Sequence, residues 1–248
     1  MNQLSKLTCA LFLSSSVIPA LAQEEHAHWG YAGDIAPAKW GQLSDEYAVC
    51  GSGKNQAPVD IQSVVKAGLP ALPVAYQTGG EQILNNGHTI QVVYQQGSHV
   101  SIDGRDFMLK QFHFHAPSEN RINGQAYPLE LHLVHADQDG NLAVVGLMFE
   151  EGAANALLAT LWAQMPAKAG TTVALNPAVN VADLLPTDRH YYRFAGSLTT
   201  PPCSEGVRWL VLKHPMTASK EQIAQFAQLM GHPNNRPLQP LGARQIVE

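Results

Sequence analysis

The middle of the sequence is a series of short alternating apolar segments separated by tight-turn signals. Asn85-Asn86-Gly87, Gln96-Gly97-Ser98 and Asp103-Gly104 are such turns, and residues 137–141 contain another. Because connections this short join antiparallel neighbours, the pattern predicts successive hairpins. A chain with this pattern is expected to form a large central sheet that is twisted and mostly antiparallel.

Two further segments have apolar residues at helical spacing. Residues 153–165 form the first and end before Pro166, and residues 219–230 form the second and end before Gly231. No internal repeat or charged linker divides the chain. The sequence therefore predicts a mainly β fold, in which a single domain has a large central sheet and peripheral short helices.

The first 22 residues have the features of a secretory signal peptide. Lys6 provides the positive start, residues 7–18 the apolar stretch and Ala20-Leu21-Ala22 the small-residue cleavage site. A membrane anchor is the alternative, but the stretch is shorter than the roughly 20 residues that a span needs. We therefore expect a signal peptide at residues 1–22, a mature domain at residues 23–248 and a periplasmic or secreted location.

The charge balance argues against two classes of partner. The chain has 15 Lys and Arg against 20 Asp and Glu, which gives a formal net charge of −5, and it contains no basic run. Nucleic acid and anionic membrane surfaces are therefore not expected as main partners.

Two cysteines remain in the mature chain, because Cys9 lies within the signal peptide. In an exported protein, an even pair such as Cys50 and Cys203 is typical of one disulfide. Two unpaired buried thiols are the alternative.

Two predicted strands carry histidines where apolar residues are usual. In QFHFHAP (residues 111–117), strand alternation places Gln111, His113 and His115 on one face; in ELHLVH (130–135), it places Glu130 and His132 together. Three neutral imidazoles with an open fourth position are a known catalytic zinc arrangement. A His-x-His pair alone is weak evidence, but Gln111 and Glu130 stand where they could accept hydrogen bonds from the outer ring nitrogens.

Seven blocks, in order along the chain, resemble the α-class carbonic anhydrases of the exported bacterial type. They are HWGY (28–31), GKNQAPVDI (53–61), NNGHTIQV (85–92), QFHFHAPSEN (111–120), ELHLVH (130–135), YYRFAGSLTTPPCSEGVRWLVL (191–212) and NNRPLQPLGARQI (234–246). The resemblance implies the fold of that family and makes residues 23–248 its catalytic domain. It also implies reversible hydration of CO2 to bicarbonate and a proton, by attack of zinc-bound hydroxide on CO2.

The resemblance further implies a cofactor and a set of ligands. The cofactor would be Zn²⁺, the substrate CO2 or bicarbonate, and the inhibitors sulfonamides and small anions. It implies no membrane span and leaves the oligomeric state open.

Individual residue roles also come from the resemblance. The zinc ligands would be His113, His115 and His132, oriented by Gln111, Glu130 and the backbone carbonyl of Asn234. Thr199 and Glu119 would align the hydroxide, His88 would be the proton shuttle, and Tyr31, Asn86 and Gln91 would order water. The apolar wall for CO2 would be Val134, Val144, Leu198, Val207 and Trp209. Gln91, Phe114 and Asn235 depart from well-known animal members, which puts proton-transfer rates and ligand selectivity in doubt.

Two other functions are compatible with parts of the pattern. His113-x-His115 followed by Glu119 resembles half of a cupin metal motif, in which Glu119 would be a ligand, but the other spacings of that motif are missing. A non-catalytic binding protein on the carbonic anhydrase fold is the second alternative. The presence of all three histidines, Thr199 and Glu119 argues against it.

Overall fold

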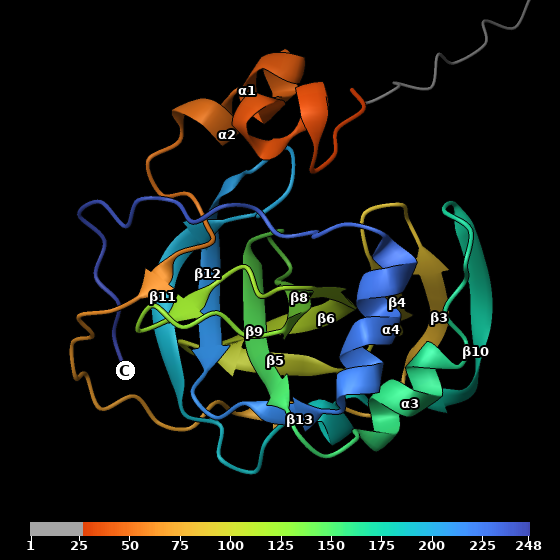
Figure 1. Cartoon of the computed structure of the whole chain (residues 1–248). Helices are drawn as coiled ribbons and strands as arrows, with labels where there is room; N and C mark the ends of the chain where they lie inside the picture. Colours follow the sequence, from red (N-terminus) through yellow and green to blue (C-terminus); the bar gives the residue numbers. More distant parts are fainter. Residues whose placement is uncertain (1–26) are drawn as a thin grey trace, which may run out of the picture.

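The computed structural model describes residues 27–248, so the predicted signal peptide lies outside the described residues. One large curled sheet runs through the molecule, with helices on one face and a helical N-terminal segment at one end (Figure 1). The helices are α1 (Trp40–Leu43), α2 (Val49–Ser52), α3 (Ala156–Trp162) and α4 (Lys220–Met230). The strands are β1 (Asp60–Ile61), β2 (Val74–Ala75), β3 (Gly80–Asn85), β4 (Ile90–Tyr94), β5 (His99–Ile102), β6 (Arg105–His115), β7 (Arg121–Ile122), β8 (Leu129–Ala136), β9 (Leu142–Glu151), β10 (Thr171–Val179), β11 (Tyr191–Ser197), β12 (Glu205–Leu212) and β13 (Met216–Ala218).

The large sheet confirms the predicted fold class. Its main strand order is β10-β3-β4-β6-β8-β9-β12-β11, and most neighbours are antiparallel. The sheet is nevertheless mixed, because β12 and β13 both pair with β9 in parallel. Parallel pairing needs a long connection, and the chain between β9 and β12 passes through α3, β10 and β11 before it returns.

One predicted hairpin is wrong. Gln96-Gly97-Ser98 joins β4 to β5, but these two strands do not pair with each other. The reason is the length of β6, which has 11 residues and can accommodate two neighbours along one edge. Val100 of β5 lies opposite Phe107 near the start of β6, whereas Val92 of β4 lies opposite Phe112 further along.

The two predicted helices are present, and one of them is shorter than expected. Residues 153–165 contain α3, which begins at Ala156 because the Asn155 side chain accepts from the backbone N–H groups of the first turn. α4 matches residues 219–230: Ser219 and Gln222 form a capping box, and Gly231 ends the helix at a φ of +72°. Both helices pack on the sheet through Phe114 of β6, which contacts Trp162 of α3 and Phe226 of α4.

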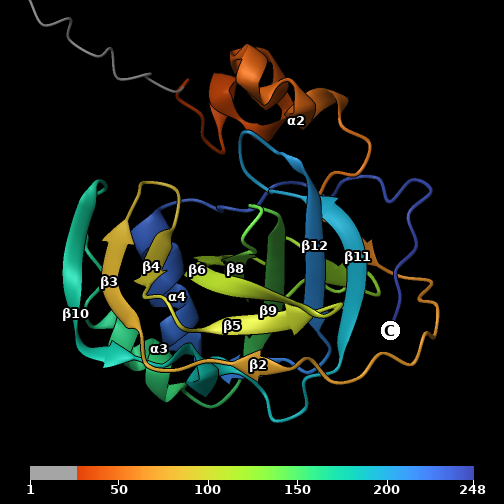
Figure 2. The ribbon, with the colours of Figure 1, turned by 180° about the vertical axis from the view of Figure 1, so that it is seen from behind.

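The N-terminal segment with α1 and α2 was not predicted from periodicity. It lies over one end of the sheet in both views (Figures 1 and 2). A small separate core forms there around Trp40, Tyr47 and the predicted disulfide, which joins Cys50 to Cys203. None of the described helices is long and apolar enough to cross a membrane.

His135 is buried on the face of β8 opposite to His132 and makes only structural contacts. Its Nε2 lies 2.7 Å from the Tyr76 hydroxyl, and its Nδ1 lies 3.3 Å from the Ala143 carbonyl oxygen. The ring can donate to Ala143 and accept from Tyr76 only when it is neutral. Burial accordingly lowers the pKa of His135 to about 3, although the bond to Ala143 opposes the shift.

We expect acid to destabilise the fold through His135. The unfolded chain binds a proton at this ring below a pKa of about 6.5, while the folded chain does so only near pH 3. The contribution of His135 to the free energy of unfolding is thus complete above the unfolded pKa. It decreases as the pH falls from the unfolded pKa toward the folded pKa, and about 2 kcal/mol is lost at pH 5. Denaturant unfolding at pH 7.5 and pH 5 should show a smaller pH dependence in His135→Gln than in the unmutated protein. Equal pH dependence in the two proteins would contradict the assignment.

Candidate functional site

Strand pairing brings three histidines together in the centre of the sheet. In the antiparallel register of β6 and β8, His113 lies opposite His132, and His115 lies opposite Glu130. One nitrogen of each imidazole lies within 4.8 Å of the corresponding nitrogens of the other two. His115 and His132 are 1% exposed. The predicted metal ligands therefore converge on one point.

The outer nitrogen of each ring lies beside an acceptor oxygen, and for His113 and His115 the contact is a hydrogen bond. His113 Nδ1 lies 2.8 Å from Gln111 Oε1, and His115 Nδ1 lies 2.7 Å from the Asn234 carbonyl oxygen. His132 Nε2 lies 2.9 Å from Glu130 Oε1. These contacts leave Nε2 of His113, Nε2 of His115 and Nδ1 of His132 to face one another. All three predicted orienting residues are thus in contact with the expected ring.

The donor set fits a divalent metal ion. Burial lowers the pKa of all three imidazoles, and the neighbouring imidazoles lower it further for His113 and His132. The rings are therefore neutral, which is the form that binds a metal. Within the described part of the chain, His115 Nε2 is buried without a hydrogen-bond partner. A metal ion would satisfy this nitrogen, and three neutral imidazoles are a zinc donor set.

Glu130 is buried at 0% exposure but has a full set of hydrogen bonds. Its Oε2 accepts from the backbone N–H groups of Glu119 and Asn120, at 2.7 and 2.9 Å, and its Oε1 accepts from Asn120 Nδ2 at 2.8 Å. Burial raises the pKa of this carboxyl, and the bonds from Asn120 oppose the shift. Gly146 lies opposite His132, where a Cβ would stand 3.3 Å from Glu130 Oε1. The glycine leaves the space that this carboxylate occupies.

Glu119 lies beside the imidazoles and is 2% exposed, so it is not a solvent-exposed loop carboxylate. Its Oε1 accepts from the Arg236 backbone N–H at 2.8 Å. Its Oε2 lies 3.5 Å from His115 Nε2 and 3.8 Å from His132 Nδ1 and, among the described residues, has no hydrogen-bond partner. Burial raises the pKa of Glu119 to about 8; the Arg236 bond and the facing Thr199 hydroxyl oppose this shift.

The five residues predicted for the apolar wall lie in one hydrophobic cluster beside His132. The Trp209 ring is 4.8 Å from the His132 ring, edge to face, and Val144 lies opposite both Trp209 and Val134 in the sheet. Val144, Val207 and Trp209 are buried, and the partly buried Val134 and Leu198 pack against the same cluster. The five residues therefore belong to one apolar cluster, which contacts His132 through Trp209.

A pocket of about 110 Å³ opens onto the histidines from the solvent side. It is lined by Gln111, His113 and His115 together with the predicted solvent-path residues Tyr31, Asn86, His88 and Gln91, and by Trp29, Thr89 and Thr200. The Asn86 side-chain oxygen accepts from the backbone N–H groups of His88 and Thr89, at 2.9 and 2.8 Å, and so shapes the turn. The predicted shuttle residue thus lines the same pocket as His113 and His115.

Trp29 and Arg236 are among the site residues that were not predicted individually. Trp29 stacks on His88 with ring centroids 3.7 Å apart, and Arg236 binds Glu119 through its backbone N–H. Both lie inside the blocks HWGY and NNRPLQPLGARQI, but nothing in residue type or spacing shows these contacts. Burial lowers the pKa of His88, and the charges of His28 and His232 lower it further.

Comparison with known proteins gives the same family over nearly the whole chain. The sequence model of the family described as eukaryotic-type carbonic anhydrase matches residues 35–248. A carbonic anhydrase of Pectobacterium carotovorum is 52% identical over 242 residues, which cover 98% of this chain and 98% of that protein. One of Neisseria gonorrhoeae is 46% identical over 246 residues, covering 99% of this chain and 97% of that protein.

A solved structure shows the same similarity in three dimensions. It is the complex of the α-carbonic anhydrase from Thermovibrio ammonificans with the inhibitor sulfanilamide. It has a TM-score of 0.88 and 50% sequence identity, and covers 90% of this chain and 100% of that chain. These similarities favour the interpretation from sequence blocks over the cupin alternative.

Proposed function

Since this chain belongs to the α-class carbonic anhydrase family of enzymes, we propose that it catalyses the zinc-dependent reversible hydration of CO2 to bicarbonate and a proton. The observation that carries the proposal is the convergence of the three imidazoles, each with its outer nitrogen beside an acceptor oxygen. His113, His115 and His132 would hold the metal, oriented by Gln111, Glu130 and Asn234. A zinc ion held by these residues would lower the pKa of bound water to about 7, a chemistry best known for carbonic anhydrase itself.

Thr199 and Glu119 would align the nucleophile. Ionisation of Glu119 would be favoured by a cation at the adjacent imidazoles, and an ionised carboxylate only accepts hydrogen bonds. Thr199 would therefore donate its single hydroxyl proton to Glu119 and could only accept from the nucleophile. A lone pair would then point toward CO2. The Arg236 backbone N–H supports this by holding the other oxygen of Glu119.

The apolar wall would hold CO2, which has no charge to bind. Val144, Val207 and Trp209 are buried, and the Trp209 ring contacts His132. The Trp209 indole N–H already donates to the Ser197 carbonyl oxygen, so these side chains present only apolar atoms. Sulfonamides and small anions would compete for the same space. The sulfanilamide complex of the Thermovibrio ammonificans protein supports this expectation.

We also propose that the mature enzyme is exported. The disulfide between Cys50 and Cys203 supports an oxidising compartment. Residues 1–22 would be the signal peptide and residues 23–248 the catalytic domain.

The proposal is tested by metal analysis combined with stopped-flow CO2 hydration. We expect about one zinc per chain, loss of hydration when a chelator removes it, and recovery when zinc is returned. Full hydration activity in protein without metal would contradict the proposal, as would a zinc-loaded protein with no hydration activity.

His88 is expected to control proton release without taking part in attack on CO2. His88→Ala should lower kcat roughly tenfold or more, because the imidazole that would relay the proton to solvent is lost. It should leave kcat/KM for CO2 nearly unchanged, because that ratio covers only steps up to the formation of bicarbonate. Added imidazole should restore much of the lost kcat by carrying the proton itself.

A matched control separates the loss of proton transfer from the general effect of removing a histidine. His214 is exposed and contacts Asp188, so His214→Ala should change neither kinetic constant. An equal fall in kcat and kcat/KM for His88→Ala, with no rescue by imidazole, would make His88 a structural residue.

A further inference from the structure

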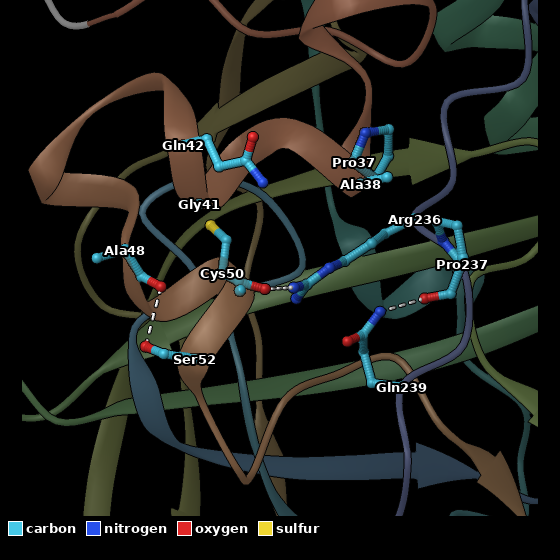
Figure 3. A pocket seen from close by; sticks show the side chains of 11 residues that line it. Pro37, Ala38, Gly41, Gln42, Ala48, Cys50, Ser52, Arg236, Pro237 and Gln239 are labelled. Carbon is cyan, nitrogen blue, oxygen red and sulfur yellow. Dashed lines mark hydrogen bonds between the residues drawn. The ribbon is translucent and has the colours of Figure 1, made fainter.

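A second pocket, of about 590 Å³, lies between the N-terminal helices and the C-terminal segment (Figure 3). Its lining comes from α1, α2 and the chain around residues 236–239. It is separate from the histidine pocket, since the residues that line the two are different. The lining residues are Pro37, Ala38, Gly41, Gln42, Ala48, Cys50, Gly51, Ser52, Arg236, Pro237 and Gln239.

Arg236 provides the charge in this pocket. Its side chain extends along the pocket toward the Cys50 carbonyl, with Gln42 and Gln239 on either side of it (Figure 3). Arg236 is 2% exposed, and its guanidinium lies 5.6 Å from the centre of the Trp40 ring. Among the described residues that line the pocket, none is acidic.

The guanidinium is bound by neutral acceptors, which do not balance its charge. Nη1 donates to Gln56 Oε1 and to the Ala57 carbonyl oxygen, both at 2.8 Å, and Nη2 donates to the Cys50 carbonyl oxygen at 2.9 Å. Within residues 27–248, no carboxylate forms an ion pair with it. Burial lowers the pKa of Arg236 to about 10, and the charge of Glu119 only partly opposes this shift. A buried cation without an anionic partner is costly.

Two guanidinium donors remain for a ligand. These three bonds use both hydrogens of Nη1 and one of Nη2, so Nε–H and the second Nη2–H have no acceptor within the described residues. A carboxylate can accept both N–H groups along one edge of a guanidinium, and this geometry is a strong and specific one for arginine.

The rest of the pocket selects an organic ligand over an inorganic anion. Its volume falls in the range of sites that hold small organic molecules. Pro37, Ala38, Ala48 and Pro237 give it apolar walls around the charge, and the amides of Gln42 and Gln239 add neutral polar groups.

We infer that this pocket, defined as the Arg236 pocket, binds an organic monocarboxylate, with its carboxylate on Nε and Nη2 of Arg236 and its apolar body against the proline and alanine walls. This inference does not rest on the proposed CO2 hydration. Arg236 is shared between the two regions. Its guanidinium lies at this pocket, whereas its backbone N–H donates to Glu119 beside the histidines. Occupancy of the pocket would therefore be adjacent to the catalytic centre without entering it.

The test uses benzoate as the probe and benzamide as its neutral counterpart. The ¹⁵N-labelled, zinc-loaded protein is saturated with a primary sulfonamide, so that an anion cannot bind at the histidine pocket. Benzoate should shift the Arg236 Nε–H and the backbone N–H signals of Gly41 and Gly51 saturably, and benzamide should not. A linear response to benzoate, or equal shifts with benzamide, would overturn the inference. If the purified protein holds no zinc, the same titration is made without sulfonamide, so failure of the proposed function does not decide this result.

Charge variants that keep the Arg236 bonds intact make the test specific. Gln42 is exposed, and Gln42→Glu places a carboxylate of the same size in the pocket. It should weaken benzoate binding about tenfold, as expected for a like charge several ångströms away. Gln228→Glu makes the same change on the exposed side of α4, away from this pocket, and should leave binding unchanged. Equal benzoate affinity in the two variants would overturn the assignment to Arg236.

Discussion

Replacing His132 with alanine is expected to lower CO2 hydration by at least about a thousandfold while leaving the chain folded. Two imidazoles remain in His132→Ala, and two neutral donors hold zinc poorly. The substitution also removes the partner of Glu130, but that carboxylate keeps its bonds from Asn120 and from the Glu119 backbone. The main loss should therefore be metal and not structure.

His135→Gln is the matched control for this change. It alters a buried histidine of the same strand that faces away from the metal site. We expect zinc content and hydration to remain close to those of the unmutated protein in His135→Gln, and to be lost together in His132→Ala. Metal analysis, circular dichroism and stopped-flow hydration measure the three quantities. Retention of one zinc and of full activity in His132→Ala would refute the proposed ligand set.

Much of this fold could be predicted from the sequence because its main signals are local. Alternation in β6 and β8 was sufficient to place Gln111, His113 and His115 on one face, and the short turn at Asp103-Gly104 does join two paired strands. The turn at residues 96–98 misled the prediction, because pairing there depends on the length of β6 and not on the turn itself. Parallel pairing of β9 with β12 has no local signal at all.

Some residues of the site could be predicted from local patterns, and others could not. Alternation within two strands predicts which faces the proposed metal ligands share, but Glu119 and Asn234 come from loops whose positions depend on the whole fold. Only the resemblance between sequence blocks indicated their roles. The contacts of Trp29 and Arg236 could not be predicted from the sequence. A stacked indole and a buried guanidinium depend on contacts between distant segments, which leave no local pattern.

Thr199→Ala should lower kcat/KM for CO2 by about a hundredfold, the scale observed when one positioned hydrogen-bonding group is removed from a reacting oxygen. Thr199 is 5% exposed and is not one of the proposed ligands, so the zinc content should not change. Thr199→Ser keeps the hydroxyl and should retain most of the activity. Affinity for a primary sulfonamide should also fall in Thr199→Ala, because the inhibitor would lose the same hydrogen-bond acceptor.

A double-mutant cycle then decides whether Thr199 acts through Glu119. Glu119→Gln should lower kcat/KM for CO2 about as much as Thr199→Ala does, since an amide can donate to Thr199 and reverse the direction of the hydrogen bond. If the two residues work as one unit, the double variant should be no slower than either single variant, as is usual for coupled groups. Additive losses would mean that the residues act independently. In that case, the burial of Glu119 beside the imidazoles would have to be explained by the metal site alone.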